Sequence, residues 1–376
     1  MKMWKMLVLW AACVAVSLPI HMSTGVGDRS DGKLRIHILD VGQADCIVIE
    51  TPEGRLMVVD VGEDKDRAGK EAKVLHKYLK ENIHRYTIDY LLITHYHEDH
   101  MGWPRKVSST GLAYLLSLAD IKVKKVIDRG LEIQSRSRLF EVYGKWIKGA
   151  GVKRETIRFR PTAPGERRQI DLGDDISIDV IAFNGSPYRS KLPGSMVIPD
   201  PEAQRKSSEH NFSIVFVLHY RDFDMYFGGD VCGYDRAPYD DIESHFIGQL
   251  KDVEVVKVSD HGSVWGTREE LLEALSPEVS IISCGRRLGF PARSTVEKLV
   301  SYRDNRTGKP RGSDIYQTGG EDGAELLRPF PVSGKVQTIT GAPIVIETDG
   351  KDSFWIRYKD VEQEYLLDEQ DAYRSD

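Results

Sequence analysis

Residues 94–100 read Thr94-His95-Tyr96-His97-Glu98-Asp99-His100, a short run that is rich in metal-ligating side chains. The run follows residues 88–93, whose apolar and β-branched side chains predict a buried strand. It precedes Met101-Gly102-Trp103-Pro104, which breaks regular structure. We therefore expect the ligating side chains to leave the core at the end of a strand and to face a cleft.

The spacing of these side chains predicts a site for two metal ions. In an irregular turn, His95 and His97 can point at one ion, and a helical start could turn Asp99 and His100 toward a second. Two divalent ions about 3.5–4 Å apart can hold a bridging hydroxide and polarise an oxygen of the substrate. Imidazole-rich ligation with carboxylate favours zinc first, then manganese or iron. The alternative is a histidine-rich surface loop that binds no metal.

The same run resembles the HxHxDH motif of the metallo-β-lactamase superfamily, and other motifs extend this resemblance over nearly the whole chain. Residues 38–45, Ile-Leu-Asp-Val-Gly-Gln-Ala-Asp, are similar to the LDVGQGD signature of the ComEC-type branch, with Ala44 where that branch usually has glycine. Residues 260–263, Asp-His-Gly-Ser, resemble its HHGS motif, with Asp260 in place of the first histidine. The resemblance implies an α/β fold, the four-layer αββα sandwich of the superfamily, for residues 33–358.

The resemblance also implies a complete set of ligands. Asp60 matches the first motif, whose aspartate supports the metal loop by hydrogen bonding and does not bind the ion. Residues 228–230, Gly-Gly-Asp, match the fourth motif, whose aspartate bridges the metals. His210 is the candidate for the third motif, and Asn211 is the alternative because ComEC-type members often carry asparagine there. The implied ligands are His95, His97 and His210 for the first metal and Asp99, His100 and His261 for the second, with Asp230 between them.

Two of these aspartates are expected to take part in catalysis. Asp99 is placed to accept a proton from the attacking hydroxide, and Asp230 is expected to bridge the metals. Asp260 lies beside the ligand candidate His261, and we expect it either to orient that histidine or to act in proton transfer. Both Asp60 and Asp260 are thus predicted to support the ligands without binding an ion.

The charge balance of the chain limits its partners. The chain has 376 residues, and its 52 Lys and Arg against 58 Asp and Glu give a net charge of −6. That balance argues against a general polyanion binder, although a local basic groove is still possible. Basic residues between positions 122 and 168 are expected either to form a solvated face or to steer an anionic substrate: Lys122, Lys124, Lys125, Arg129, Lys153, Arg154, Arg158, Arg160, Arg167 and Arg168.

The two ends of the chain differ from its middle. Lys2 and Lys5 precede an apolar segment at 6–18 that is short for a bilayer span, so residues 1–25 are predicted to be a secretory signal peptide. An uncleaved N-terminal membrane anchor is the alternative. Both the signal peptide and the anchor would place the protein outside the cytoplasm, either secreted or periplasmic.

Strands are expected at 168–172 and 354–358, and residues 359–376 are expected to form an acidic, polar tail. Residues 184–208 lack periodicity and are expected to form a lid over the cleft.

The expected function is that of an exported binuclear metal-dependent hydrolase. The ComEC-type resemblance implies a phosphodiester substrate, in nucleic acid or in a choline-bearing or lipid phosphate. The sequence lacks the channel-forming membrane part of ComEC proteins, so no transmembrane channel is expected. A stable protein partner is not inferable from it. The alternatives are a metallo-hydrolase of a lactam, lactone or thioester, and a non-catalytic module that binds metal or an envelope polymer.

Overall fold

The computed structural model describes residues 31–62, 71–104, 110–159, 168–187, 201–285, 287–304, 307–320 and 336–367. The predicted signal peptide, residues 188–200 of the predicted lid and residues 368–376 of the predicted tail lie outside this part of the chain. Within it, no helix has both the length and the apolar character that a membrane crossing requires.

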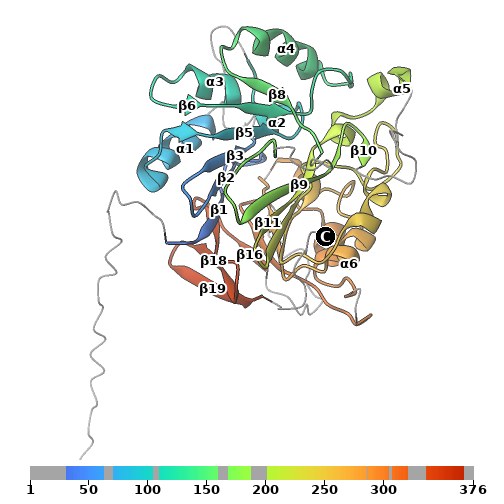
Figure 1. The fold of residues 1–376 in the computed structure, drawn as a ribbon. Coiled ribbons are helices and arrows are strands. Elements are labelled where there is room, and N and C mark those ends of the chain that lie inside the picture. Colours follow the sequence, from blue (N-terminus) through green and yellow to red (C-terminus); the bar gives the residue numbers. More distant parts are fainter. Residues whose placement is uncertain are drawn as a thin grey trace, which may run out of the picture.

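Two large β-sheets occupy the middle of the molecule (Figure 1). The first sheet has the strand order β19-β18-β17-β1-β2-β3-β5-β7-β8. Its strands are β1 (Leu34–Ile38), β2 (Ile47–Glu50), β3 (Leu56–Val59), β5 (Tyr90–Ile93), β7 (Val126–Asp128), β8 (Arg154–Thr156), β17 (Ile344–Thr348), β18 (Ser353–Tyr358) and β19 (Val361–Leu366).

The second sheet has the strand order β10-β9-β11-β12-β13-β14-β15-β16. Its strands are β9 (Ile176–Phe183), β10 (Ser186–Pro187), β11 (Val215–Tyr220), β12 (Phe223–Phe227), β13 (Val255–Lys257), β14 (Val279–Ile282), β15 (Asp314–Gln317) and β16 (Val336–Thr338). A separate small sheet pairs β4 (Thr87–Ile88) with β6 (Lys122–Val123).

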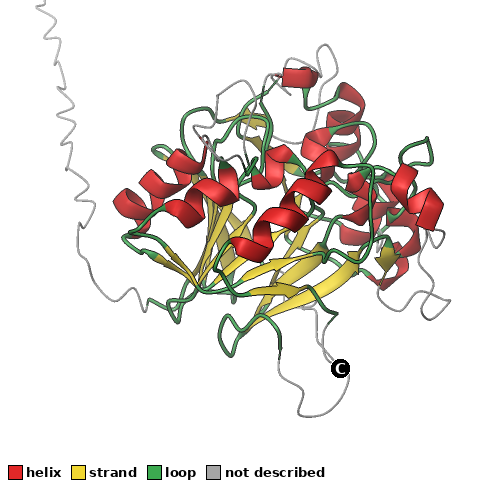
Figure 2. Cartoon of the chain, turned by 90° about the horizontal axis from the view of Figure 1, so that it is seen from above, coloured by secondary structure: helices red, strands yellow, loops and turns green. Residues whose placement is uncertain are grey.

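Helices cover the outer face of each sheet. The first sheet carries α1 (Glu71–Tyr78), its π-helical continuation η2 (Leu79–Ile83), α3 (Gly111–Ser117) and α4 (Arg138–Trp146), and the second carries α6 (Glu269–Leu275) and α7 (Arg293–Leu299). Figure 2 shows the strands gathered in the middle, with helices to either side. The shorter helices are α2 (Glu98–Met101), α5 (Pro201–Lys206), η3 (Ile147–Gly149), η4 (Glu209–Phe212), η5 (Glu243–His245), η6 (Ile247–Gln249), η7 (Ser259–Gly262) and η8 (Arg287–Gly289).

The buried apolar side chains form three layers of core, as a four-layer αββα sandwich requires. One core lies between the sheets, where the rings of Phe216 and Phe227 stack with centroids 4.5 Å apart. A second lies under the helices of the first sheet and includes Leu75 and Tyr143. The third lies under α6 and α7 and includes Leu272. Strands covered on both faces are apolar almost throughout, as in β11. The fold class predicted from the sequence is confirmed.

The structure corrects the predicted end of the core. Residues 361–366 do not belong to a solvated tail but form β19, which pairs antiparallel with β18 at the edge of the first sheet. Tyr365 anchors this strand, because its ring stacks on Phe354 and its hydroxyl hydrogen-bonds to the Tyr316 hydroxyl and to Asp314. The other residues of β19 are mostly polar and exposed, so the sequence resembles that of a tail.

The predicted strand at 168–172 is also wrong. Ile170 and Leu172 are buried in the core between the sheets, but their backbone joins no sheet. Apolar alternation there reflects burial of a loop, which a sequence pattern does not distinguish from a strand.

Gly62 marks a tight contact between the loop after β3 and the turn of residues 95–100. A Cβ atom at this position would lie 2.0 Å from the Asp99 carbonyl oxygen and 2.7 Å from the Asp45 carbonyl oxygen. We expect Gly62→Ala to lower the free energy of unfolding by about 1–3 kcal/mol, as overpacking does. Gly149→Ala is the control, because a Cβ there meets nothing within 4 Å. Urea-unfolding midpoints measure both, and equal midpoints would contradict the expected clash.

Candidate metal centre

The candidate ligands meet where four strands end. Asp60 follows β3 and His95 follows β5, and these two strands run parallel in the first sheet. Asp230 follows β12 and His261 follows β13, which run parallel in the second sheet. Loops at the carboxyl ends of parallel strands share one edge of a sheet, and ligand sites of α/β proteins are commonly found there. The two halves of the sandwich thus contribute to one site.

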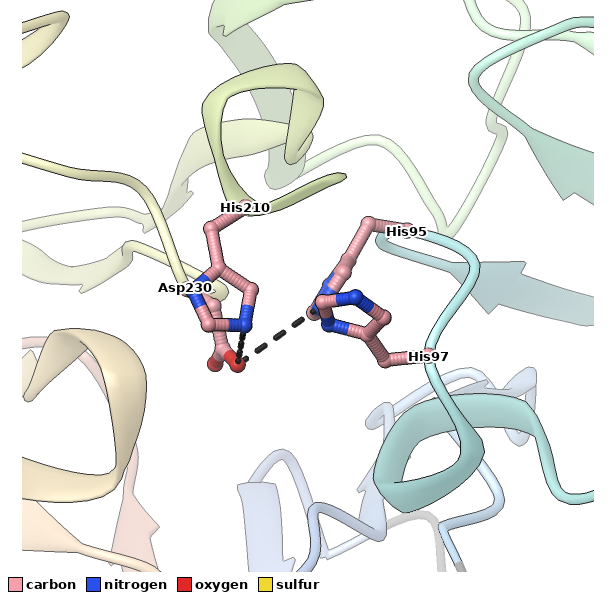
Figure 3. A group of neighbouring side chains, drawn as sticks. All are labelled: His95, His97, His210 and Asp230. Carbon is pink, nitrogen blue, oxygen red and sulfur yellow. Dashed lines mark hydrogen bonds and ion pairs between the residues drawn. The ribbon is translucent and has the colours of Figure 1, made fainter. Parts of the chain in front are cut away.

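The first group of ligand atoms comes from His95, His97, His210 and Asp230, all within 4.8 Å of one another. Figure 3 shows the imidazoles of the two turns pointing at one another, with the Asp230 carboxylate beside them. His95 Nε2 lies 3.0 Å from His97 Nδ1. Asp230 Oδ2 lies 3.6 Å from both His95 Nε2 and His210 Nε2.

Of the two alternatives for the third motif, the structure places His210 in this group. Asn211 is buried on the other side of η4, where its amide nitrogen donates to the carbonyl oxygen of Pro238 and to the carboxylate of Asp240. Asn211 therefore fixes the loop that carries these two acceptors, and only His210 is available as a ligand.

The second group comes from Asp99, His100 and His261. The Nε2 atoms of His100 and His261 lie 3.3 Å apart, and His261 Nε2 lies 3.6 Å from Asp99 Oδ2. Asp230 Oδ2 lies 3.1 Å from His100 Nε2 and 3.7 Å from His261 Nε2. One oxygen of Asp230 thus faces both groups, which is the position that a bridging carboxylate needs.

The chemistry of these side chains fits divalent metal ions. Imidazole nitrogens converge in pairs at 3.0 and 3.3 Å, and His95, His100 and Asp230 are almost completely buried. Asp230 Oδ1 and His210 Nδ1 are buried without a hydrogen-bond partner among the described residues. Convergent imidazole and carboxylate groups suit zinc, which takes nitrogen and oxygen ligands at about 2 Å.

The charge states of the first group suit a cation. Burial lowers the pKa of His95 well below its usual value, and burial followed by the charge of His210 lowers the pKa of His97 to about 4. Burial alone would raise the pKa of Asp230, but His100 and His261 hold it well below its usual value. Neutral imidazoles and ionised carboxylates are the forms that bind metal. In the second group, burial alone would lower the pKa of His100 and His261, but Asp230 raises both, that of His261 to about 9, so a metal there would displace their protons.

Asp60 hydrogen-bonds to the turn that carries the ligand candidates. Its carboxylate accepts hydrogen bonds of 2.8 Å from the Thr94 backbone N–H and 2.7 Å from the Thr94 hydroxyl. The same carboxylate lies 2.8 Å from His100 Nδ1. A hydrogen bond there fixes the imidazole orientation and leaves Nε2 free for a metal.

Asp260 does not orient His261, which corrects one of the two predicted roles. His261 Nδ1 faces the Ser283 carbonyl oxygen at 2.8 Å. The Asp260 carboxylate instead accepts the Ser263 hydroxyl hydrogen bond, and its Oδ1 lies 3.9 Å from His210 Nδ1. Asp260 therefore lies near His210, a ligand candidate of the first group, without hydrogen-bonding to it.

The sequence analysis missed a buried ion pair beneath the second group. Lys257 Nζ lies 3.0 Å from both carboxylate oxygens of Asp45, and each side chain is nearly inaccessible. Burial would raise the pKa of Asp45, but Lys257, followed by His261 and His100, holds it below its usual value. One sequence feature could have indicated this pair, namely the lysine at the end of the apolar strand β13. A lysine is rarely fully buried without a partner, so a lysine in a buried strand implies a buried acidic group beside it.

A second missed feature joins the two turns that carry the first group. Glu209 accepts hydrogen bonds from the Tyr96 backbone N–H at 2.8 Å and from Arg129 Nε and Nη2 at 2.7 and 2.8 Å. Both side chains of this ion pair are fully buried. Tyr96 stands between His95 and His97, and Glu209 precedes His210, so the carboxylate fixes these turns relative to each other.

These contacts bear on the basic residues from 122 to 168, for which a solvated face and the steering of a substrate were the two alternatives. Arg129 and Arg154 are held inside the protein by Glu209 and Asp128. Lys124 pairs with Asp89, and both Lys125 and Lys153 pair with Glu155. Arg160 and Arg167 lie outside the described residues. Five of the ten residues of this set are thus held in ion pairs within the fold.

Comparison with known families agrees with this geometry. Residues 39–112 match the model of the Metallo-beta-lactamase superfamily, and this segment contains Asp60 and the turn from His95 to His100. Over these residues the chain is similar to that superfamily. Together with the histidine and aspartate groups, this partial match supports a metal-dependent hydrolase. No curated protein matches the chain in sequence.

Several solved structures are similar to the chain at low sequence identity. An inferred metal-dependent hydrolase from Parabacteroides distasonis is 12% identical with a TM-score of 0.38, over 75% of this chain and 93% of that protein. An inferred Zn-dependent hydrolase of the metallo-beta-lactamase superfamily from Thermotoga maritima is 12% identical with a TM-score of 0.33, over 77% and 100%. CmlA, a diiron β-hydroxylase from Streptomyces venezuelae, is 13% identical with a TM-score of 0.36, over 66% and 44%.

The position of Asp230 between the two groups predicts the effect of its removal on metal content. Protein reconstituted with zinc should hold about two ions per chain, and Asp230→Asn should hold about one or fewer because the amide is a weaker ligand. Circular dichroism should be unchanged. Elemental analysis measures the content, and a full zinc complement in the variant would contradict a bridging role.

Asp224→Asn provides the matched control for this measurement. Asp224 is buried near the opposite end of β12, where it pairs with His219 at 2.7 Å. This substitution alters a buried aspartate on the strand that precedes Asp230 without touching either ligand group. Its zinc content should equal that of the wild type.

Proposed function

We propose that the chain is an exported binuclear metal-dependent phosphodiesterase. The observation that carries the proposal is the shared Asp230 oxygen, which lies between a group of three histidines and a group of Asp99, His100 and His261. When bound, two divalent ions would activate a water molecule and stabilise the negative charge that develops on the phosphoryl oxygens. Zinc fits this ligand set best, and manganese is the second candidate.

The protein groups around this site would orient the ligands and handle the proton. Asp99 is the most exposed of the second group, and its carboxylate faces His261. Burial would raise the pKa of Asp99, but its hydrogen bond with His261 and the charge of His100 hold the pKa below its usual value. Asp99 is thus ionised at neutral pH and can accept the proton that the attacking water releases.

The substrate class rests on the sequence resemblance and on charge. The signatures at 38–45 and 260–263 are similar to those of the ComEC-type branch, whose resemblance implies a phosphodiester in nucleic acid or in a choline-bearing or lipid phosphate. A phosphodiester gains charge on its oxygens in the transition state, where two cations stabilise it best. A lactam develops charge on one carbonyl oxygen and a leaving nitrogen, and needs less positive charge around it.

Substrate panels test this choice. The wild type should cleave an activated aryl phosphodiester or linear DNA faster than a chromogenic cephalosporin, with zinc or with manganese. His97→Ala should lose this activity, because the substitution removes a ligand candidate from the first group. Efficient cephalosporin turnover without phosphodiester cleavage under either metal would refute the proposal.

Export is the second part of the proposal, and it rests on the charged and apolar pattern of residues 1–18. A fusion of residues 1–30 to a reporter that is active only outside the cytoplasm should give a signal. Replacing Lys2 and Lys5 with glutamate should reduce it, because the positive n-region directs insertion. A silent reporter with the fusion kept inside the cell would count against export.

A further inference from the structure

A column of stacked side chains leads from the first ligand group to the surface. The His210 and Tyr239 rings stack at a centroid distance of 5.8 Å and an angle of 22°, and Tyr239 stacks on Trp265 at 5.2 Å and 17°. The Arg236 guanidinium lies 5.1 Å from the centroid of the Trp265 ring. Tyr239 follows Asp230 along the chain and Trp265 follows His261, so the loops that carry the ligands also build this column.

Tyr239 has a fixed backbone and a free hydroxyl. Its N–H donates to the Arg236 carbonyl oxygen at 2.8 Å, and its own carbonyl oxygen accepts from the Arg236 N–H at 3.1 Å. The neighbouring Pro238 carbonyl oxygen accepts from the Ser208 N–H and the Asn211 side chain, which ties the loop to the helix of His210. Among the described residues, the phenol hydroxyl has no hydrogen-bond partner, and the ring is half-buried.

Two arginines without an acidic partner in the described part of the chain lie near this column. Arg236 is exposed and contacts Trp265. Arg136 is also exposed, and its N–H donates to the Ser207 carbonyl oxygen at 3.2 Å. The serines on either side of Arg136 bind the ligand-bearing turns, since Ser135 donates to Glu209 and Ser137 donates to the Tyr96 carbonyl oxygen.

The phenol of Tyr239 is available as a hydrogen-bond donor at neutral pH, because a tyrosine hydroxyl has an ordinary pKa of about 10.

We propose that Tyr239, Arg136 and Arg236 form an anion-binding subsite beside the first ligand group, in which the phenol donates a hydrogen bond to a phosphoryl oxygen of the substrate. The inference rests on the proposed phosphodiesterase function and specifies which residues would bind the phosphate. All three side chains offer donors, and the guanidinium groups supply positive charge and bind phosphate oxygens well. Stacking holds the Tyr239 ring in place, which lowers the entropy cost of binding.

The same residues disfavour a cationic headgroup. A quaternary ammonium group binds in a cage of free aromatic faces. Here the Arg236 guanidinium already lies over Trp265 and would repel a second cation. Of the phosphodiesters that the function allows, the subsite therefore favours those without a trimethylammonium group near the phosphate, as in nucleic acid.

Binding of inorganic phosphate to zinc-loaded protein, freed of excess zinc, tests the subsite by titration calorimetry. Tyr239→Phe keeps the stacked ring and removes only the hydroxyl, so it should weaken phosphate binding about tenfold, as loss of a hydrogen bond to a charged group does. Arg136→Gln and Arg236→Gln should weaken binding several-fold, more at low salt than at high salt. Zinc content should equal that of the wild type in all three variants.

Arg221→Gln is the matched control, since Arg221 is partly exposed and precedes β12 at the end remote from Asp230. It should bind phosphate as the wild type does. Unchanged phosphate affinity in Tyr239→Phe, loss of zinc from that variant, or absence of phosphate binding by the wild type would each overturn the subsite. Binding that depends on Tyr239 without any phosphodiester turnover would refute the proposed function and support the subsite.

Discussion

The buried ion pair of Glu209 and Arg129 is the interaction on which the geometry of the site depends. Removing two charges from water is costly, and the pair is stable only because Tyr96, Ser135 and Asn184 add hydrogen bonds to its free atoms. Breaking such a pair by removing one partner costs about 3–5 kcal/mol. Because Glu209 precedes His210 and its carboxylate also accepts the Tyr96 backbone N–H, folding of the sandwich also assembles the first ligand group.

Backbone conformation reinforces this assembly at the strand ends. Asp60, Asp260 and His261 have φ angles of 60°, 48° and 52°, in the left-handed region that few residues other than glycine adopt. Such conformations are costly and occur where the surrounding structure enforces them. Here the surrounding hydrogen bonds of Thr94, Ser263 and the Ser283 carbonyl oxygen enforce them. These backbone conformations thus lower the stability of the fold somewhat, and they orient carboxylate and imidazole groups toward one point.

The sequence predicts the structural features that depend on residues close together in the chain. It does not predict those that depend on contacts between residues far apart in the chain. The run from His95 to His100 and the glycines before Asp230 are local patterns, and the superfamily resemblance placed them in one site. Glu209 with Arg129 and Asp45 with Lys257 are partners far apart in sequence, and a lone charged residue in a sequence does not reveal its partner. Strand β19 was missed for a related reason, because its single anchor is Tyr365 and its other side chains face solvent.

The distribution of charge explains how one site can attract both cations and an anion. Asp60, Asp99, Asp230 and Asp260 converge on the ligand histidines, while Lys257 neutralises only Asp45. The interior of the site is therefore acidic, which favours divalent cations. With two cations bound, that excess is offset, and the outer arginines then face a site that no longer repels an anion. Metal binding would thus precede substrate binding, although the chain as a whole carries a charge of −6.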